Sequence, residues 1–269
     1  MTNKKDVVKS NALIEACYNP GNIYQMRVLL AAMMQIKAAD EHFDHTRNFV
    51  ITANALAELT GIQAGKNYRE LRKAAKELRA MCITVKEKPN GDIGAPDETD
   101  INVTSSCRYY KTEGKISLRF GPEIIPYLSA LRKKFTQYQA KYVLPMRSGY
   151  GIRLYELCLQ WLGNEREFEV EEFKQMLGVH DKYPVIADLR KRVIDPALKD
   201  INTHSDIRVT FGQRKAGRKI THFQFMIVKS AQKSEPKKPS FDEYVELNAR
   251  PGEDWKQAKQ RLSPEYRKL

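Results

Sequence analysis

The chain has 269 residues, of which 42% are hydrophobic and 29% charged, a composition typical of a soluble globular protein long enough for two domains. Its formal net charge of +13 favours an anionic partner. No apolar run reaches the about 18 residues of a membrane span, and no signal-type stretch follows Met1–Asp6, so the sequence argues against secretion and membrane insertion and for the cytoplasm.

The positive charge belongs to the body of the chain rather than to its end. Residues 231–269 hold nine Lys or Arg and seven Asp or Glu, a net charge of +2, which leaves +11 on the residues before them. The anionic partner is therefore expected to bind the folded part of the chain.

The four cysteines predict neither a disulfide framework nor a zinc site. Cys17, Cys82, Cys107 and Cys158 are far apart and include no Cys-x-x-Cys pair, so we expect buried free thiols in a reducing compartment. The His, Glu and Asp side chains of residues 41–45 are interpreted as part of a polar surface loop rather than as a metal site. We expect no metal and no cofactor.

The first half predicts a buried helix followed by a compact helix-turn-helix unit. Residues Ile23–Ala39 are hydrophobic on most faces, which indicates a helix in the core. The strand Phe49–Ile51 comes next, then a helix that Thr52 can cap, and Gly61 supplies the turn after it.

The next predicted helix, Lys66–Ala80, is amphipathic and basic. Leu71, Ala75, Leu78 and Cys82 recur at helical spacing and form its apolar face. A solvated polar face is the simpler interpretation of the remaining surface. We favour DNA binding, because the acidic residues lie to one side and the helix has the position of a recognition helix. Its candidate DNA contacts are Lys66, Arg69, Arg72, Lys73, Lys76 and Arg79.

A three-stranded wing is expected after this helix. It comprises Cys82–Glu87, Ile101–Tyr110 and Ile116–Phe120, with a tight hairpin at Lys111–Gly114. Residues 88–100 are rich in Gly, Pro and acids and are expected to form a mobile loop.

The second half repeats this order. A helix from Gly149 is expected to bury its apolar residues, including Trp161 and Leu162. The strand Phe168–Val170 and the short helix Glu171–Leu177 follow, and Gly178 ends that helix. A longer helix, Tyr183–Asn202, should carry Pro184 in its first turn.

This longer helix is expected to be the main reader of DNA sequence. Arg190, Lys191 and Arg192 are spread around its cylinder, so we expect at least one of them to contact phosphates. Pro196 should bend the helix and leave base reading to its N-terminal half. Strands Asp206–Phe211 and Lys219–Val228 form the second wing, whose basic tip is a candidate phosphate clamp made of Arg214, Lys215, Arg218 and Lys219.

The repeated order predicts an α+β fold of two tandem winged-helix domains. The first domain is residues 7–144, which we expect to serve dimerisation and DNA backbone contacts. The second domain is residues 145–230, the main sequence reader. Residues 231–269, in which isolated aromatics interrupt a polar stretch, are expected to be a disordered or weakly helical tail.

Three blocks of the chain resemble the iteron-binding plasmid replication initiators. They are Val8–Ala16, Tyr127–Leu128 followed by Phe135–Tyr138, and Tyr150–Leu157 with its Arg-Leu-Tyr-Glu core, and the resemblance runs from about residue 7 to residue 228. It implies monomers that bind repeated origin sequences and help to open the duplex for the host initiator and helicase machinery. It also implies homodimers that repress their own gene at an inverted repeat.

In this family a run of arginines on the second recognition helix enters the major groove. The run corresponds to residues 190–192, where Lys191 departs from the pattern. Lysine cannot form the bidentate fork that arginine makes with guanine, so the base recognised there is open.

Two other functions compete with the initiator. A dedicated winged-helix transcriptional repressor would use the same contacts, and only the family resemblance argues against it. A rolling-circle nicking enzyme needs a tyrosine beside a metal held by two histidines that flank one hydrophobic residue. The five histidines contain no such pair, so we expect no enzyme: His42, His45, His180, His204 and His222.

Overall fold

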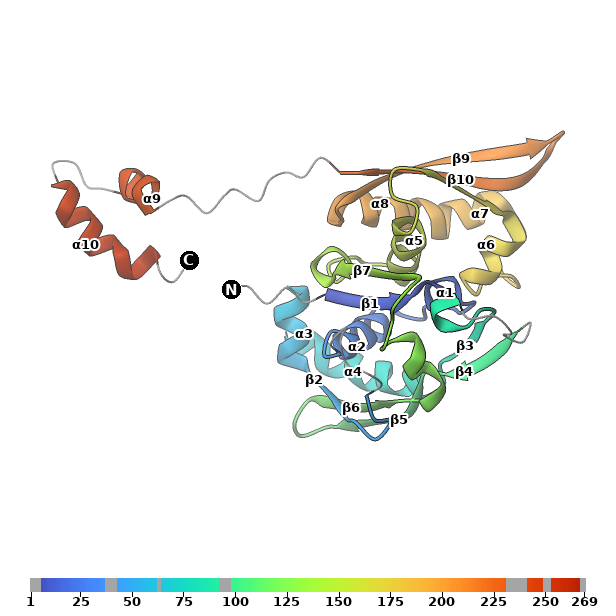
Figure 1. Ribbon diagram of the computed structural model, residues 1–269, viewed down its shortest axis with the longest axis horizontal. Helices are drawn as coiled ribbons and strands as arrows, with labels where there is room; N and C mark the ends of the chain where they lie inside the picture. Colours follow the sequence, from blue (N-terminus) through green and yellow to red (C-terminus); the bar gives the residue numbers. More distant parts are fainter. Residues whose placement is uncertain are drawn as a thin grey trace. The chain divides into compact units, whose positions relative to one another are not determined.

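The computed structural model describes residues 6–36, 43–61, 64–91, 98–230, 241–248 and 253–266. They belong to two compact units that divide after Ser230, and each unit is described by itself. In the larger unit the first domain lies below the second in Figure 1, and the sheet of each domain lies at the outer end.

The first domain begins with strand β1 (Asp6–Ser10), helix α1 (Asn11–Glu15) and helix α2 (Ile23–Met33). Residues 25–33 of α2 are all buried, which confirms the predicted core helix. The helix ends at Met33, before the predicted end. Just beyond it, the side-chain amide of Gln35 donates to the carbonyl of Val50 at 3.2 Å, which ties this end of the helix to the next strand. Residues 37–42 lie outside the described part of the chain.

The helix-turn-helix unit of the first domain is confirmed. Strand β2 (Phe49–Thr52) leads to helix α3 (Ala53–Thr60), and the Thr52 hydroxyl accepts a hydrogen bond from the Ala55 amide at 3.0 Å. Gly61 has φ of +69°, a left-handed conformation that favours glycine. Helix α4 (Ala64–Arg79) follows.

The strand pairings predicted for the first wing are confirmed, but the expectation of one three-stranded sheet is wrong, because the strands belong to two sheets. Strand β3 (Cys82–Val85) pairs with β4 (Thr99–Asn102), whereas β5 (Thr104–Tyr110) and β6 (Lys115–Phe120) join β2 in the order β2–β6–β5. The break falls at Val103, a buried residue whose amide donates to the Met81 carbonyl at 3.0 Å. Part of the expected mobile loop is therefore strand, and residues 92–97 of it are not described.

The second domain has the same order of elements. Helix α5 (Gly149–Leu159) precedes strand β8 (Glu165–Glu169) and helix α6 (Val170–Met176). A continuous helix then runs from Ile186 to His204, and strands β9 (Ile207–Ala216) and β10 (Lys219–Lys229) complete a sheet of order β8–β10–β9. Two tandem winged-helix domains in an α+β fold are thus confirmed.

The remaining short elements are one strand and three 3₁₀ turns. Strand β7 (Phe135–Gln139) pairs with β1, and so joins the start of the chain to the segment before α5. The 3₁₀ turns are η1 (Pro89–Gly91), η2 (Pro122–Tyr127) and η3 (Ala140–Tyr142).

Trp161 and Leu162 are not in the core, contrary to expectation. Helix α5 ends at Leu159, so both residues lie in the following turn, where their exposed fractions are 45% and 41%. The Arg166 guanidinium lies over the Trp161 ring at 5.7 Å, which gives the indole a cationic rather than an apolar neighbour.

A buried charge cluster joins the N-terminal strand to α5. Lys9 Nζ donates to Glu156 Oε1 at 2.6 Å, and the Tyr138 hydroxyl donates to the same oxygen. Arg153 Nη1 lies 3.5 Å from the other carboxylate oxygen of Glu156 and Nη2 donates to the Ala16 carbonyl at 2.9 Å. Burial, followed by the Glu156 charge, raises the pKa of Tyr138, which keeps this hydroxyl a donor.

The C-terminal unit contains two helices, α9 (Phe241–Asn248) and α10 (Trp255–Tyr266). Val245, Ala258 and Leu262 form a small buried cluster between them. Of the two expected alternatives, disorder or weak helix, these residues adopt the helical one. Two of the aromatics are not isolated, because the rings of Phe241 and Tyr244 both pack against Tyr266.

The cysteines match the prediction only in part. They are free thiols, but Cys158 alone is buried, Cys17 and Cys107 are half-buried, and Cys82 is exposed. Cys82 was expected on the apolar face of α4, but the helix has ended before it and it lies in β3. In the part of the chain that the structure describes, no helix has the length and apolar character needed to cross a bilayer.

We expect Glu156→Gln to lower the free energy of unfolding by about 3–5 kcal/mol, because Lys9 would stay buried without a carboxylate partner. Urea denaturation measures this loss. The matched control is Glu98→Gln, which removes the partner of Lys86 from an exposed ion pair and should cost about 1 kcal/mol or less. Equal losses in the two variants would show that the buried cluster contributes no more than a surface pair.

Candidate DNA interface

Helix α4 presents a basic surface opposite its buried face. Leu71, Ala74, Ala75 and Leu78 are buried in the core of the first domain. The exposed cations on its other side are Arg69, Arg72, Lys73, Lys76 and Arg79. Lys66 lies in the helix, but its side chain is outside the described part of the structure.

The two acids of α4 neutralise little of this charge. Arg69 lies 3.7 Å from Glu70, and Lys73 lies 3.9 Å from Glu77, both near the limit for an ion pair. Glu77 is also held by the side-chain amide of Asn22, on the first turn of α2. The surface of α4 therefore remains strongly cationic and suits the phosphates of DNA.

The helix expected to read the DNA sequence, called the reading helix below, contains a π turn. It comprises α7 (Ile186–Leu189), a π segment (Arg190–Ile194) and α8 (Asp195–His204). The Asp195 amide donates to the Arg190 carbonyl, five residues back. Pro196 explains this turn, because its ring has no N–H to donate and opposes the carbonyl of Arg192. The predicted bend thus takes the form of a widened turn.

The π turn changes which side chains face outward. Arg190, Lys191 and Arg192 are all exposed, whereas the next two residues, Val193 and Ile194, are both fully buried. Consecutive residues of a helix lie about 100° apart, so the three cations still spread around the exposed side of the helix. Their exposure leaves each of them accessible to DNA, and which of them reads a base stays a prediction.

Arg190 is held between the reading helix and the second wing. Its Nε lies 3.2 Å from Asp195 Oδ1, and its guanidinium lies 5.6 Å from the centre of the Phe211 ring on β9. Val185, just before the helix, is 56% exposed, and an apolar side chain there suits the methyl group of thymine. Pro184 lies before Val185, outside the first helical turn where it was predicted.

The second wing separates Arg214 from the other predicted clamp residues. Arg214 lies within β9 and forms a bidentate pair with Glu167 of β8, with Nη2–Oε1 at 2.5 Å and Nε–Oε2 at 3.0 Å. The hydrogen bond from Arg214 lowers the pKa of Glu167 and keeps it charged. The prediction that Arg214 lies at the wing tip is wrong. Exposed cations at or beside the tip are Lys215, Arg218 and Lys219.

Three cations outside both helices were missed by the sequence analysis. Arg108, Lys115 and Arg119 lie on the outer face of the first sheet. Their signal was the period of two in β5 and β6, where apolar residues alternate with cationic or hydroxyl residues.

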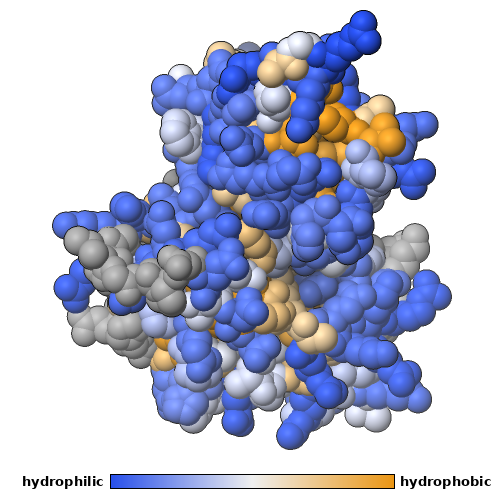
Figure 2. All heavy atoms as spheres, turned by 90° about the vertical axis from the view of Figure 1, so that its right-hand side faces the viewer, coloured by the Kyte–Doolittle hydropathy of each residue, from blue (hydrophilic) through white to orange (hydrophobic). Residues whose placement is uncertain are grey.

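The surface around these sites is mainly hydrophilic. Figure 2, which views the molecule from the right-hand side of Figure 1, shows blue surface over both domains and one hydrophobic area in the upper one. The exposed large apolar side chains of the second domain are Trp161, Leu162, Val185, Met226 and Val228. Each domain thus presents one exposed basic helix on a mainly hydrophilic surface.

Comparison with known proteins identifies both domains. Residues 6–159 match the family described as initiator replication protein, WH1, and residues 169–227 match the initiator Rep protein, WH2. The first match includes α5, beyond the expected boundary between residues 144 and 145.

Two curated relatives come from Escherichia coli. A replication initiation protein is 29% identical over 175 residues, which are 62% of this chain and 52% of the relative, so the match spans about half the length of that protein. The PI protein is 28% identical over 232 residues, 75% of this chain and 76% of the relative. Among solved structures, the Pi initiator protein in complex with iteron DNA is 25% identical with a TM-score of 0.68, covering 86% of this chain and all of that chain.

We expect Pro196→Ala to weaken specific DNA binding at least about tenfold, or about 1.4 kcal/mol, because relaxation of the π turn would rotate residues 190–192 against the core. Thermal stability should not fall, since a helical proline is removed. Fluorescence anisotropy with specific and scrambled DNA gives the affinities, and circular dichroism the melting temperature. Pro184→Ala, in the turn before the helix, is the control. An unchanged ratio of specific to scrambled affinity would contradict a positioning role.

Arg218→Ala should reduce the slope of log K against log salt by about 0.9, the value for one lost phosphate contact. Arg214→Ala should leave this slope unchanged, because Glu167 already holds its guanidinium. DNA titrations at several salt concentrations measure both slopes. A reduction of the same size in the Arg214 variant would show that DNA displaces Glu167.

Proposed function

Since this chain belongs to the family of initiator replication proteins, we propose that it starts plasmid replication by binding repeated origin sequences, or iterons, as a monomer. The observation that carries the proposal is the pair of winged-helix domains, each with an exposed basic helix, matched along most of the chain by the Pi initiator bound to iteron DNA. DNA is thus the partner, and the cytoplasm the place of action.

The finer assignments extend this proposal. Residues 145–230 read the sequence chiefly through the exposed cations of the π segment, and residues 7–144 supply backbone contacts through α4 and take part in homodimerisation. The dimer represses its own gene at an inverted repeat, and the DNA-bound monomer recruits the host initiator and helicase machinery. The protein acts by binding and not by catalysis, as expected from its DNA-binding relatives.

We propose that the DNA contacts come from three places. On α4 they are Lys66, Arg69, Arg72, Lys73, Lys76 and Arg79; on the reading helix they are Arg190, Lys191 and Arg192; on the second wing they are Lys215, Arg218 and Lys219. The structure supports these assignments by the exposure of every described member. Arg214 is a supporting residue of the wing.

A plasmid that carries only the candidate origin tests the proposal. With the gene supplied in trans, we expect the wild type to give transformants and Arg192→Ala to give far fewer. The Arg192 side chain is expected to contact a base, and its removal should cost about 1–3 kcal/mol of binding free energy. Lys229→Ala, a change of equal charge at the end of β10, should retain transformation.

Two outcomes would contradict the proposal. Operator binding and repression without plasmid maintenance would identify a dedicated repressor. A magnesium-dependent nick in supercoiled origin DNA would identify a nicking enzyme of the rolling-circle type.

A further inference from the structure

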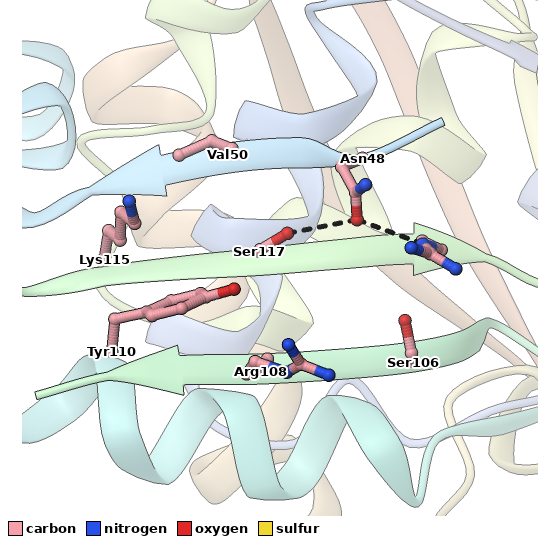
Figure 3. Close-up of a pocket in the computed structure, with 8 residues that line it drawn as sticks. Asn48, Val50, Ser106, Arg108, Tyr110, Lys115 and Ser117 are labelled. Atoms are coloured by element: carbon pink, nitrogen blue, oxygen red, sulfur yellow. Dashed lines mark hydrogen bonds between the residues drawn. The ribbon is translucent and has the colours of Figure 1, made fainter. Parts of the chain in front are cut away.

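The outer face of the first sheet is hollowed and cationic. A hollow of about 400 Å³ lies over strands β2, β6 and β5, and Figure 3 shows side chains from all three strands around it. We name it the cationic sheet face, defined by Asn48, Arg108, Tyr110, Lys115, Ser117 and Arg119.

The sheet register brings these side chains to one face. Arg108 pairs with Ser117, and Tyr110 pairs with Lys115, across the ladder between β5 and β6. The alternate residues of β6, Leu118 among them, are fully buried on the opposite face. A solvated polar face is the ordinary outcome of such a pattern. The positive charge of the cationic sheet face distinguishes it from an ordinary polar face.

The lining residues of the hollow include three cations and no Asp or Glu. Neutral groups orient one of the cations: the Asn48 side-chain oxygen accepts from Arg119 Nε at 3.0 Å and from Ser117 Oγ at 3.2 Å. Lys115 lies over the Tyr110 ring at 4.9 Å and pairs with Glu113 of the hairpin turn. Arg108 forms no ion pair with any described residue. Most of the positive charge of the face is therefore uncompensated.

The same face of the second domain is neutralised. There Glu167 of β8 binds Arg214 of β9 in a bidentate pair and lies 3.8 Å from His222 of β10. The two winged-helix domains therefore differ in the net charge of this sheet face. A sheet face can be solvated without the positive charge that the first domain carries there.

The cationic sheet face is next to the DNA-binding helix of its own domain. Helix α4 packs along β5, as the helix beside that strand in Figure 3 shows. Burial raises the pKa of the Cys107 thiol on β5 to about 11, and the charge of Arg79, on the last turn of α4, acts against this rise. Arg79 of α4 therefore lies near β5, the strand that carries Arg108 on its outer face.

We propose that the cationic sheet face binds the phosphate backbone of duplex DNA that flanks the repeat held by α4. The inference rests on the proposed function. Arginine forms charge-assisted hydrogen bonds with phosphates, and the hydroxyls of Ser117 and Tyr110 add neutral donors. Lys115 and Arg119 are four residues apart on β6, about 13 Å along the strand, which corresponds to about four base pairs at about 3.4 Å each. The first domain thus holds its DNA by two surfaces.

The experiment compares two DNA lengths. One duplex carries only the repeat found beside the gene. The other is extended by about ten base pairs, one helical turn, first at one end and then, in a separate duplex, at the other. The variant is Arg108→Ala with Arg119→Ala. Its control is Arg132→Ala with Lys133→Ala, an equal change of charge at two exposed residues of the loop before β7.

We expect the wild type and the control to bind the flanked duplex with a steeper salt slope than the repeat alone. The variant should lose about 1.8 of this slope, 0.9 for each arginine, and should bind the repeat alone as the control does. Equal slopes of variant and control on the flanked duplex would overturn the inference. A second outcome would also overturn it: the variant keeps the steeper salt slope on the flanked duplex but no longer binds an oligothymidylate of about 16 nucleotides. That result would show that the face binds single-stranded DNA. Failure of the wild type to bind the repeat alone would count against the proposed function instead.

Discussion

The carboxylate of Glu156 is the constraint on which the arrangement of the two domains depends. It is fully buried, so it must be paired there, and its partners come from β1, from β7 and from its own helix α5. Asp200 on α8 extends these contacts from α5 to the next helix. Its carboxylate accepts hydrogen bonds from the backbone amides of Arg147 and Ser148, just before α5, at 2.9 and 2.8 Å. Hydrogen bonds and ion pairs therefore connect the first strand of the chain, through α5, to the basic helix of the second domain.

A close backbone contact reinforces this connection. Gly178 has φ of +59°, and a Cβ there would lie 2.3 Å from the amide nitrogen of Asn19. The Asn19 side chain in turn donates to the Gly178 carbonyl at 3.1 Å. The segment after α6 can thus lie directly against the segment before α2, which adds a close backbone contact to the polar contacts between the two domains.

Local signals in the sequence predicted the parts of the site that depend on local physics. The cap at Thr52, the left-handed turn at Gly61 and the two faces of α4 follow from residues within a few positions of one another. The errors concern long-range partners. The predicted strand at 101–110 is interrupted at Val103 because the Val103 amide donates to the carbonyl of Met81. Arg214 is held in an ion pair because Glu167 lies across the sheet from it. Trp161 reads as core, yet its helix ends two residues earlier. None of these outcomes has a signature within its own segment.

The π turn makes the direction of the basic side chains on the reading helix sensitive to the number of residues in that helix. It amounts to one extra residue in a helix whose buried face stays continuous from Leu189 through Val193 and Ile194 to Ala197. Deletion of Pro196 would remove both the extra residue and the ring that opposes the Arg192 carbonyl, so the turn would become ordinary α-helix. The basic segment would then change direction while the hydrophobic contacts on either side kept their places. A single-codon deletion would therefore redirect the basic segment in one step and leave the core of the second domain intact.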